Sequence, residues 1–303
     1  MATVTTPAPS GTAPPSRIRR ISAVLFRHPR GKLALMLTPP LGWLIVVYLI
    51  SLALLLVTSF WRLNVLTSQI EHVWGLQNYQ TLYRDEVYRT ITLRTAGMAA
   101  AVTVTDLILA FPIGYYLARL ASRRTRTILT LAVVLPLWSN YLVRMFSWKI
   151  MTAGGGPLES FIGLFGIHKS LAFSNWAVWL TFCYLWLPFA ILPVYAAFER
   201  VPDSLLEASS DLGGRGWVTF RRVVIPLVLP GMAAASIFTF SLTLGDYITP
   251  NTVGKAYFIG NTIEQYVGTA NNLPLAAAFA MVPVAIMAIY LLLMKRLGAF
   301  EAL

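Results

Sequence analysis

Six long apolar segments alternate with polar connections along the 303-residue chain. They predict helices over residues 41–60, 94–117, 128–148, 176–198, 223–244 and 275–294. Each segment has about 20 residues, the length that an α-helix needs to cross roughly 30 Å of hydrocarbon. A backbone inside a bilayer must satisfy its own hydrogen bonds, which a helix does within one segment. The predicted fold class is therefore all-α, a polytopic membrane protein with six transmembrane helices.

Composition agrees with this class. Hydrophobic residues make up 57% of the chain and charged residues only 12%, whereas soluble domains carry about 25% charged residues. The net charge of +12 would indicate nucleic acid in a soluble protein. In a membrane protein, Lys and Arg collect in cytoplasmic loops instead. We therefore expect the lipid bilayer, and no nucleic acid, as the partner of these charges.

The positions of the basic residues predict the orientation in the membrane. With the N-terminus in the cytoplasm, 16 of the 24 Lys and Arg residues lie inside and 8 lie outside or at outer helix ends. The excess of basic residues on the cytoplasmic side predicts an N-in, C-in topology. Residues 199–222 then lie in the cytoplasm, and residues 61–92, 151–175 and 246–272 lie outside.

Two short regions precede the membrane domain. Residues 1–16 are rich in Pro, Ala, Thr and Ser, and we expect a disordered tail. Residues 17–32 combine Arg and Lys with apolar side chains at helical spacing, which predicts an amphipathic helix on the inner membrane surface. Residues 33–297 form the predicted transmembrane domain, and residues 298–303 a short C-terminal tail.

Catalytic patterns are absent from the sequence. It contains no GxxxxGK[ST] phosphate loop, no HExxH and no GxSxG. One cysteine, Cys183, and three separated histidines do not form a metal-ligand pattern. We therefore expect neither enzymatic activity nor a metal site in this chain.

Asp106 lies midway along the second predicted helix. An ionisable group at that depth faces a protein interior or an aqueous path, because its charged form is poorly stabilised in lipid. Two interpretations stay open at this point. Asp106 is protonated or pairs with a neighbouring helix, or it belongs to a solute path.

Polar and aromatic side chains also gather at the predicted outer helix ends: Trp138, Asn140, Tyr141, Arg144, Asp246 and Tyr247. Asn140 and Arg144 are four residues apart, which puts them on one face of a helix. Carboxylate and aromatic groups around an outward-opening vestibule suit an amine cation. Ordinary anchoring of helix ends explains the same residues equally well.

The connection between the fourth and fifth helices contains a further predicted helix. Asp203 is the expected N-cap, and Gly213 and Gly214 are expected to end the helix. Glu207 and Asp211 lie on its polar side. A rigid acidic helix that faces water between two spans indicates a docking surface, although a solvated loop is the alternative.

A family signature runs through this connection. Glu207-Ala208-Ser209, Gly213 and Val223-x-Ile225-Pro226 resemble the EAA signature of binding-protein-dependent ABC importer permeases, with Ser209 in place of the second alanine. Residues 135–144, 206–213, 245–250 and 259–261 resemble spermidine/putrescine importer permeases in particular. The similarity covers about residues 33–297.

The resemblance implies a type I importer in the bacterial cytoplasmic membrane. Such an importer has two permease chains, an ATPase dimer on the cytoplasmic side and an extracytoplasmic solute-binding protein. The second permease is expected to be a homologue of this chain. ATP and Mg²⁺ belong to the ATPase, so this chain needs no cofactor. The family's coupling helix docks into the ATPase, which implies an interface of Glu207, Ala208, Ser209, Asp211, Leu212 and Gly213.

The resemblance also suggests a polyamine such as spermidine or putrescine as the solute. The residues that we expect along its path are Trp138, Asn140, Tyr141, Asp246, Tyr247 and Asp106. An opine, an amino-acid derivative, an anion or a metal complex is the alternative solute. A secondary transporter that works alone is the alternative mechanism.

Overall fold

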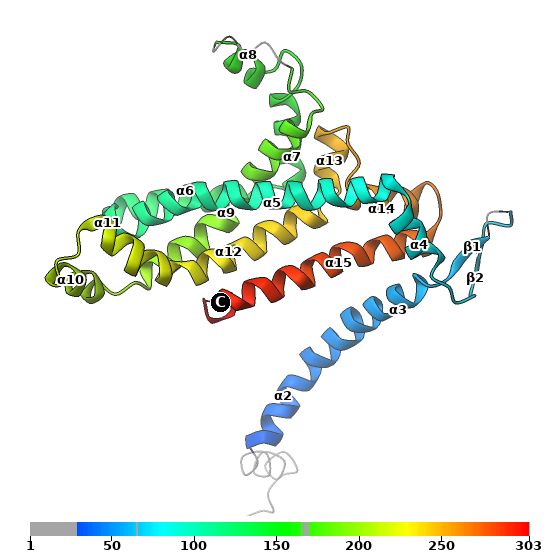
Figure 1. Cartoon of the computed structure of the whole chain (residues 1–303), viewed down its shortest axis with the longest axis horizontal. Helices are drawn as coiled ribbons and strands as arrows, with labels where there is room; N and C mark the ends of the chain where they lie inside the picture. Colours follow the sequence, from blue (N-terminus) through cyan, green and yellow to red (C-terminus); the bar gives the residue numbers. More distant parts are fainter. Residues whose placement is uncertain (1–28, 65, 165, 167–169, 303) are drawn as a thin grey trace, which may run out of the picture. The chain divides into compact units, whose positions relative to one another are not determined.

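The computed structural model describes residues 29–64, 66–164, 166 and 170–302. It is built almost entirely of helices (Figure 1). The chain divides into two units, residues 1–55 and residues 56–303, which are described separately. The predicted tail 1–16 and most of the predicted amphipathic segment 17–32 lie outside the described residues.

The first predicted span forms one uninterrupted helical stretch. It consists of α2 (Pro29–Leu44), the π-helical turn η1 (Ile45–Ile50) and α3 (Ser51–Thr58). The sequence pattern predicts a start at residue 41. The structure corrects this start, because α2 begins at Pro29 and contains Pro39 and Pro40.

Four further helical stretches are long and apolar enough to cross a membrane. They are α5 (Glu86–Tyr115) with η2 (Tyr116–Leu120), α9 (Asn175–Glu199), α11 (Gly216–Thr219) with η3 (Phe220–Val224) and α12 (Ile225–Gly245), and α15 (Leu273–Arg296). With the first stretch, five membrane-length helices are present in the described part of the chain.

The third predicted span, residues 128–148, is two helices and not one. α6 (Arg123–Trp138) and α7 (Tyr141–Met151) meet at an angle of 96°, and the count of spans reaches six only if this bent pair is one of them. The local reason lies at the break. Ser139 has an extended backbone, and the Asn140 side chain accepts a hydrogen bond from the Leu142 N–H, which makes Asn140 the N-cap of α7.

The core of the larger unit lies where α5, α9 and α12 pack together (Figure 1). Small residues permit this close approach. A Cβ atom built on Gly231 of α12 would lie 2.3 Å from the Cβ of Ala197 on α9. Ala190, Ala197 and Ala235 are buried in the same cluster, between larger side chains such as Phe198.

Short elements gather at the end of the larger unit where α5 begins. They are the hairpin β1 (Arg62–Asn64) and β2 (Gln69–Glu71), with α4 (Gln77–Arg84), α13 (Ile248–Val253) and α14 (Ile259–Gly268), whereas α8 (Pro157–Gly163) contacts α7. The hairpin was not predicted from sequence. Arg62 and Glu71 face each other across it at 2.7 Å, and this hydrogen bond lowers the pKa of the Glu71 carboxyl.

The other end of the larger unit carries α10 (Asp203–Asp211) and α11, between the end of α9 and the start of α12. The end of α5 and the start of α6 lie at the same end (Figure 1). The C-terminal α16 (Ala299–Ala302) follows α15 and packs against α12.

Candidate functional site

The predicted helix in the polar connection exists as α10. Pro202 is its N-cap, and Asp203 is its first helical residue. This corrects the expectation that Asp203 is the N-cap. The Asp203 carboxylate still lies at the positive end of the helix, where a negative charge is favourable, and it pairs with Arg119.

Gly213 and Gly214 end α10 as the sequence indicates. Gly213 has a φ of +77°, a left-handed conformation that L side chains rarely adopt. The Gly213 N–H donates to the Ser210 carbonyl at 2.9 Å, and the Gly214 N–H donates to the Ser209 carbonyl at 2.8 Å. These two bonds are those of a Schellman motif, which satisfies carbonyls at the end of a helix.

The predicted interface residues divide between an exposed face and one buried contact. Glu207, Ala208, Asp211, Leu212 and Gly213 are exposed. Ser209 is half-buried, and its Oγ lies 2.8 Å from Oγ1 of Thr219. α10 therefore presents an acidic and small surface outward while Ser209 links it to α11.

On its inner side α10 borders a cavity of about 540 Å³. Leu206 of α10 packs against the core cluster of α5, α9 and α12 and lines this cavity. Phe220 and Val224 line it from η3, Tyr115 lines it from the end of α5, and Arg119 lines it from η2. Trp217 of α11 is 69% exposed and stacks on Phe220.

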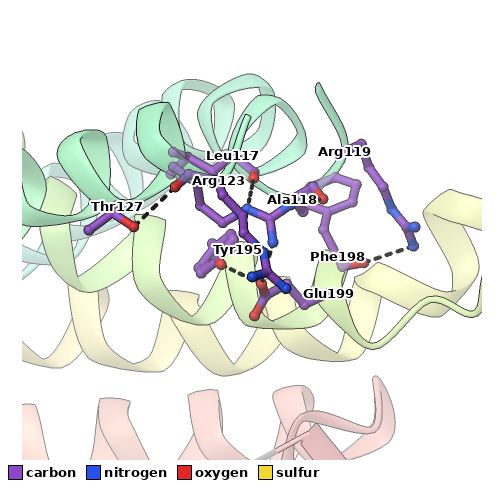
Figure 2. Close-up of polar contacts among 9 residues, drawn as sticks. Leu117, Ala118, Arg119, Arg123, Thr127, Tyr195, Phe198 and Glu199 are labelled. Carbon is purple, nitrogen blue, oxygen red and sulfur yellow. Dashed lines mark hydrogen bonds and ion pairs between the residues drawn. The ribbon is translucent and has the colours of Figure 1, made fainter. Parts of the chain in front are cut away.

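Two arginines join the helix ends beside α10. Arg126 of α6 donates from Nε to the Leu117 carbonyl and from Nη2 to the Ala118 carbonyl, each at 2.9 Å, and lies 3.5 Å from Glu199. Arg119 reaches the Phe198 carbonyl at 3.1 Å (Figure 2). Sequence reasoning assigned neither arginine a role, because their partners lie on other helices.

A second group of predicted residues meets at the opposite end of the larger unit. The Tyr141 hydroxyl donates to Oδ2 of Asp246, and Thr249 Oγ1 donates to the same oxygen at 2.9 Å. The backbone N–H groups of Ile248 and Thr249 donate to Oδ1 of Asp246 at 2.8 and 3.1 Å. The Asp246 carboxylate thus holds the start of α13.

A cavity of about 420 Å³ opens beside this carboxylate. Tyr141, Trp186, Asp246 and Tyr247 line it, together with Ser241, Leu242, Gly245 and Ile248. The rings of Tyr141 and Trp186 stack with centroids 6.0 Å apart. Trp186 was missed from sequence, because inside an apolar helix it resembles any other buried aromatic residue.

The other predicted path residues lie elsewhere. Trp138 is 85% exposed at the end of α6, and Asn140 is exposed and caps α7. The helix breaks between Trp138 and Asn140, so Trp138 lies on α6, whereas Asn140 and Arg144 both lie in the first turn of α7, where the Arg144 N–H donates to the Asn140 carbonyl at 3.3 Å. Arg144 is 9% exposed, and its Nε and Nη1 have no hydrogen-bond partner in the described chain.

Asp106 is fully buried in α5. Its carboxylate oxygens make no hydrogen bond of normal geometry among the described residues, and the Cys183 thiol of α9 lies beside them. It does not line the cavity beside Asp246. The structure therefore separates Asp106 from Tyr141, Asp246 and Tyr247, which it brings together.

The described chain combines membrane-length helices with an exposed acidic helix between two of them, which is the architecture of an integral membrane protein. No cluster of metal-ligating side chains occurs in the part of the chain that the structure describes. The chain belongs to the family of binding-protein-dependent transport system inner membrane components, which it matches over residues 110–299. It is a multi-pass inner-membrane protein, an ABC importer permease subunit that carries the EAA signature.

Individual relatives agree with this family. The chain is 43% identical to the inner membrane ABC transporter permease protein YdcU of Escherichia coli (strain K12), over 95% of this chain and 97% of that protein. It is 30% identical to the spermidine/putrescine transport system permease protein PotB of Salmonella typhimurium (strain LT2), over 84% of this chain and 90% of that one.

Solved structures share the fold. A chain of a bacterial ABC transporter involved in the import of the acidic polysaccharide alginate superimposes with a TM-score of 0.72. The match covers 92% of this chain and 98% of that chain at 13% identity. At this identity the likeness concerns the fold alone.

Proposed function

We propose that this permease subunit carries a small organic cation, a di- or polyamine of the spermidine/putrescine type, through the membrane. The cavity that combines the Asp246 carboxylate with the aromatic rings of Tyr141, Trp186 and Tyr247 carries this proposal. A carboxylate attracts an ammonium group, and aromatic faces stabilise it further when water is excluded. The similarity to PotB supports the same solute class.

In this proposal the chain supplies half of the translocation path. A second, homologous permease supplies the other half, an ATPase dimer binds on the cytoplasmic side, and a solute-binding protein delivers the solute from outside. ATP and Mg²⁺ are bound by the ATPase, and this chain holds no cofactor. Trp138, Asn140 and Asp106 complete the proposed path, with Asp106 at mid-membrane depth.

The orientation proposed is N-in and C-in. α10 then faces the cytoplasm, and its exposed Glu207, Ala208, Asp211, Leu212 and Gly213, with Ser209 behind them, form the ATPase interface. ATP binding closes the ATPase dimer and moves α10, which opens the path toward the solute-binding protein. Hydrolysis then resets the alternating-access cycle.

Uptake by the reconstituted complex tests the proposal. The permease pair, the ATPase and the binding protein are placed in proteoliposomes, and uptake of radiolabelled putrescine or spermidine is measured with and without ATP. We expect ATP-dependent uptake that an excess of unlabelled polyamine suppresses. An amino acid and an oxyanion serve as matched competitors.

If the amino acid or the oxyanion suppressed uptake and unlabelled polyamines did not, the solute would belong to another chemical class. YdcU, the 43% identical relative, carries no solute in its name. Such a result would therefore change the solute and leave the importer family intact. Uptake without ATP or the ATPase would instead indicate a secondary transporter.

A further inference from the structure

Arg119 lies in η2, at the end of the membrane-length helix that α5 begins. Its side chain is only 18% exposed although it carries a full charge. A guanidinium in such a position is stabilised when several acceptors surround it, since its five N–H groups point in fixed directions.

Three acceptors from two other elements meet this guanidinium. Nη1 donates to the Asp203 carboxylate at the start of α10, and Nη2 donates to the carbonyls of Phe198 and Val201 (Figure 2 shows the Phe198 bond). Phe198 and Val201 are buried, and they lie at and just beyond the last turn of α9. Arg119 thus adds a donor to the Phe198 carbonyl in the last turn of α9, which also accepts the Val201 N–H at 3.3 Å, and to the Val201 carbonyl just beyond the helix.

Apolar contacts between α10 and these helix ends are few. α10 contacts η3, and a cavity of about 540 Å³, lined by both Arg119 and Asp203, lies beside this contact. Leu206 is the apolar residue of α10 that reaches the core cluster. Across this space the Arg119 side chain is the polar bridge between the ends of α5 and α9 and the start of α10.

Arg126 provides an internal comparison. It binds the carbonyls of Leu117 and Ala118 in η2, and it reaches Glu199 at the end of α9. It therefore joins the same helix ends as Arg119. Unlike Arg119, it makes no hydrogen bond to α10 in the described residues.

We propose that Arg119 is the positioning residue that transmits movement of α10 to the membrane-spanning helices α5 and α9. This inference rests on the proposed role of α10 as the ATPase interface. A push on α10 moves Asp203, and the guanidinium carries that displacement to the two helix ends at once. Without the bridge, the cavity allows α10 to move while α5 and α9 stay in place.

The test compares solute uptake with ATP hydrolysis in the complete complex of permease pair, ATPase and binding protein. In Arg119→Ala we expect uptake per ATP hydrolysed to fall about tenfold, the size of a typical coupling between two sites. ATP hydrolysis itself should stay near the wild-type rate, because the exposed face of α10 is unchanged. Arg124→Ala is the matched control, since it removes an equal charge from an exposed neighbouring position.

Two gentler variants decide the matter if Arg119→Ala does not assemble. Arg119→Lys keeps the charge, but a single ammonium group cannot reach all three acceptors in the same geometry. We expect Arg119→Lys to lower the uptake per ATP hydrolysed below that of the wild type. Asp203→Asn should have a smaller effect, about twofold, because the amide oxygen can still accept the hydrogen bond from Arg119 Nη1.

Wild-type uptake per ATP in Arg119→Lys would overturn the proposal. A parallel fall of uptake and hydrolysis would overturn it as well, because it would make Arg119 a residue of assembly or stability. Failure of the wild-type complex to transport any solute would count against the proposed function instead. The two failures are therefore distinguishable.

Discussion

At the scale of single residues, Asp246 combines a structural and a proposed functional role. Its Oδ1 accepts two backbone N–H groups at the start of α13, and its Oδ2 accepts the hydroxyls of Tyr141 and Thr249. The same carboxylate lines the cavity of about 420 Å³. A substitution that tests the charge must therefore keep the hydrogen-bond acceptor.

Asp246→Asn meets this requirement. The amide oxygen can still cap α13, while the negative charge is lost. We expect the KM for putrescine uptake to rise several-fold with little change in the thermal stability of the purified permease. A doubly charged amine should be affected more than a singly charged one.

Tyr141→Phe is the matched control for this prediction. It removes the hydroxyl that binds Asp246, but it keeps the negative charge of Asp246 and the aromatic ring that stacks on Trp186. Uptake should be largely retained. An unchanged KM in Asp246→Asn would exclude Asp246 from the solute path and leave it as a cap of α13.

At the scale of elements, α10 depends on its ends. It has nine residues, and an isolated helix of this length is unstable in water because nucleation is unfavourable. The Schellman bonds of Gly213 and Gly214 and the contacts of Leu206 and Ser209 therefore hold it in place. The glycine pair was predicted from sequence, because a left-handed residue after a helix favours glycine.

The two glycines should tolerate alanine poorly. Gly213→Ala puts a Cβ into a left-handed conformation, which costs about 1–2 kcal/mol. In Gly214→Ala the new Cβ would lie 2.6 Å from the Ser209 carbonyl oxygen. We expect faster hydrogen–deuterium exchange over residues 203–212 in both variants, with reduced uptake.

Gly216→Ala supplies the control within the same connection. A Cβ atom at Gly216 would meet nothing within 4 Å, and the residue has no positive φ. Its exchange and uptake should match the wild type. Equal exchange over residues 203–212 in all three variants would show that the Schellman motif does not hold α10.

At the scale of the whole molecule, the two ends of the larger unit differ in chemistry. α10 and α11 lie at one end, and the hairpin, α13 and α14 lie at the other (Figure 1). Arg119 and Arg126 join the helix ends beside α10. The N-in, C-in orientation predicted from the loop charges puts α10 on the cytoplasmic side and the hairpin outside. Chemical labelling can measure this orientation directly.

Thiol labelling in vesicles of known sidedness makes that measurement. The native Cys183 is buried, so it should give little background. Leu212→Cys, at a position that is 89% exposed, should react with an impermeant maleimide only from the cytoplasmic side. Leu66→Cys, at a position that is 95% exposed in the hairpin loop, should react only from outside. The reverse pattern would invert the topology.

Sequence by itself determined the membrane class, the family signature, five of the spans and the glycine end of α10. Each of these depends on neighbouring residues, either on local apolar length or on local backbone conformation. The break at Ser139 and Asn140 also has a local cause. This break was not predicted because the apolar segment continues on both sides of it. The length of an apolar segment does not reveal an N-cap inside it.

Only the tertiary structure decided which distant side chains meet. Arg119 and Asp203 are 84 positions apart, and Tyr141 and Asp246 are 105 apart. Their pairing depends on how the helices that carry them pack and where each one ends, because a shift of one residue turns a helical side chain by about 100°. The contact of Arg119 with Asp203 and the cavity beside Asp246 therefore depend on helix packing, and no local sequence pattern predicts them.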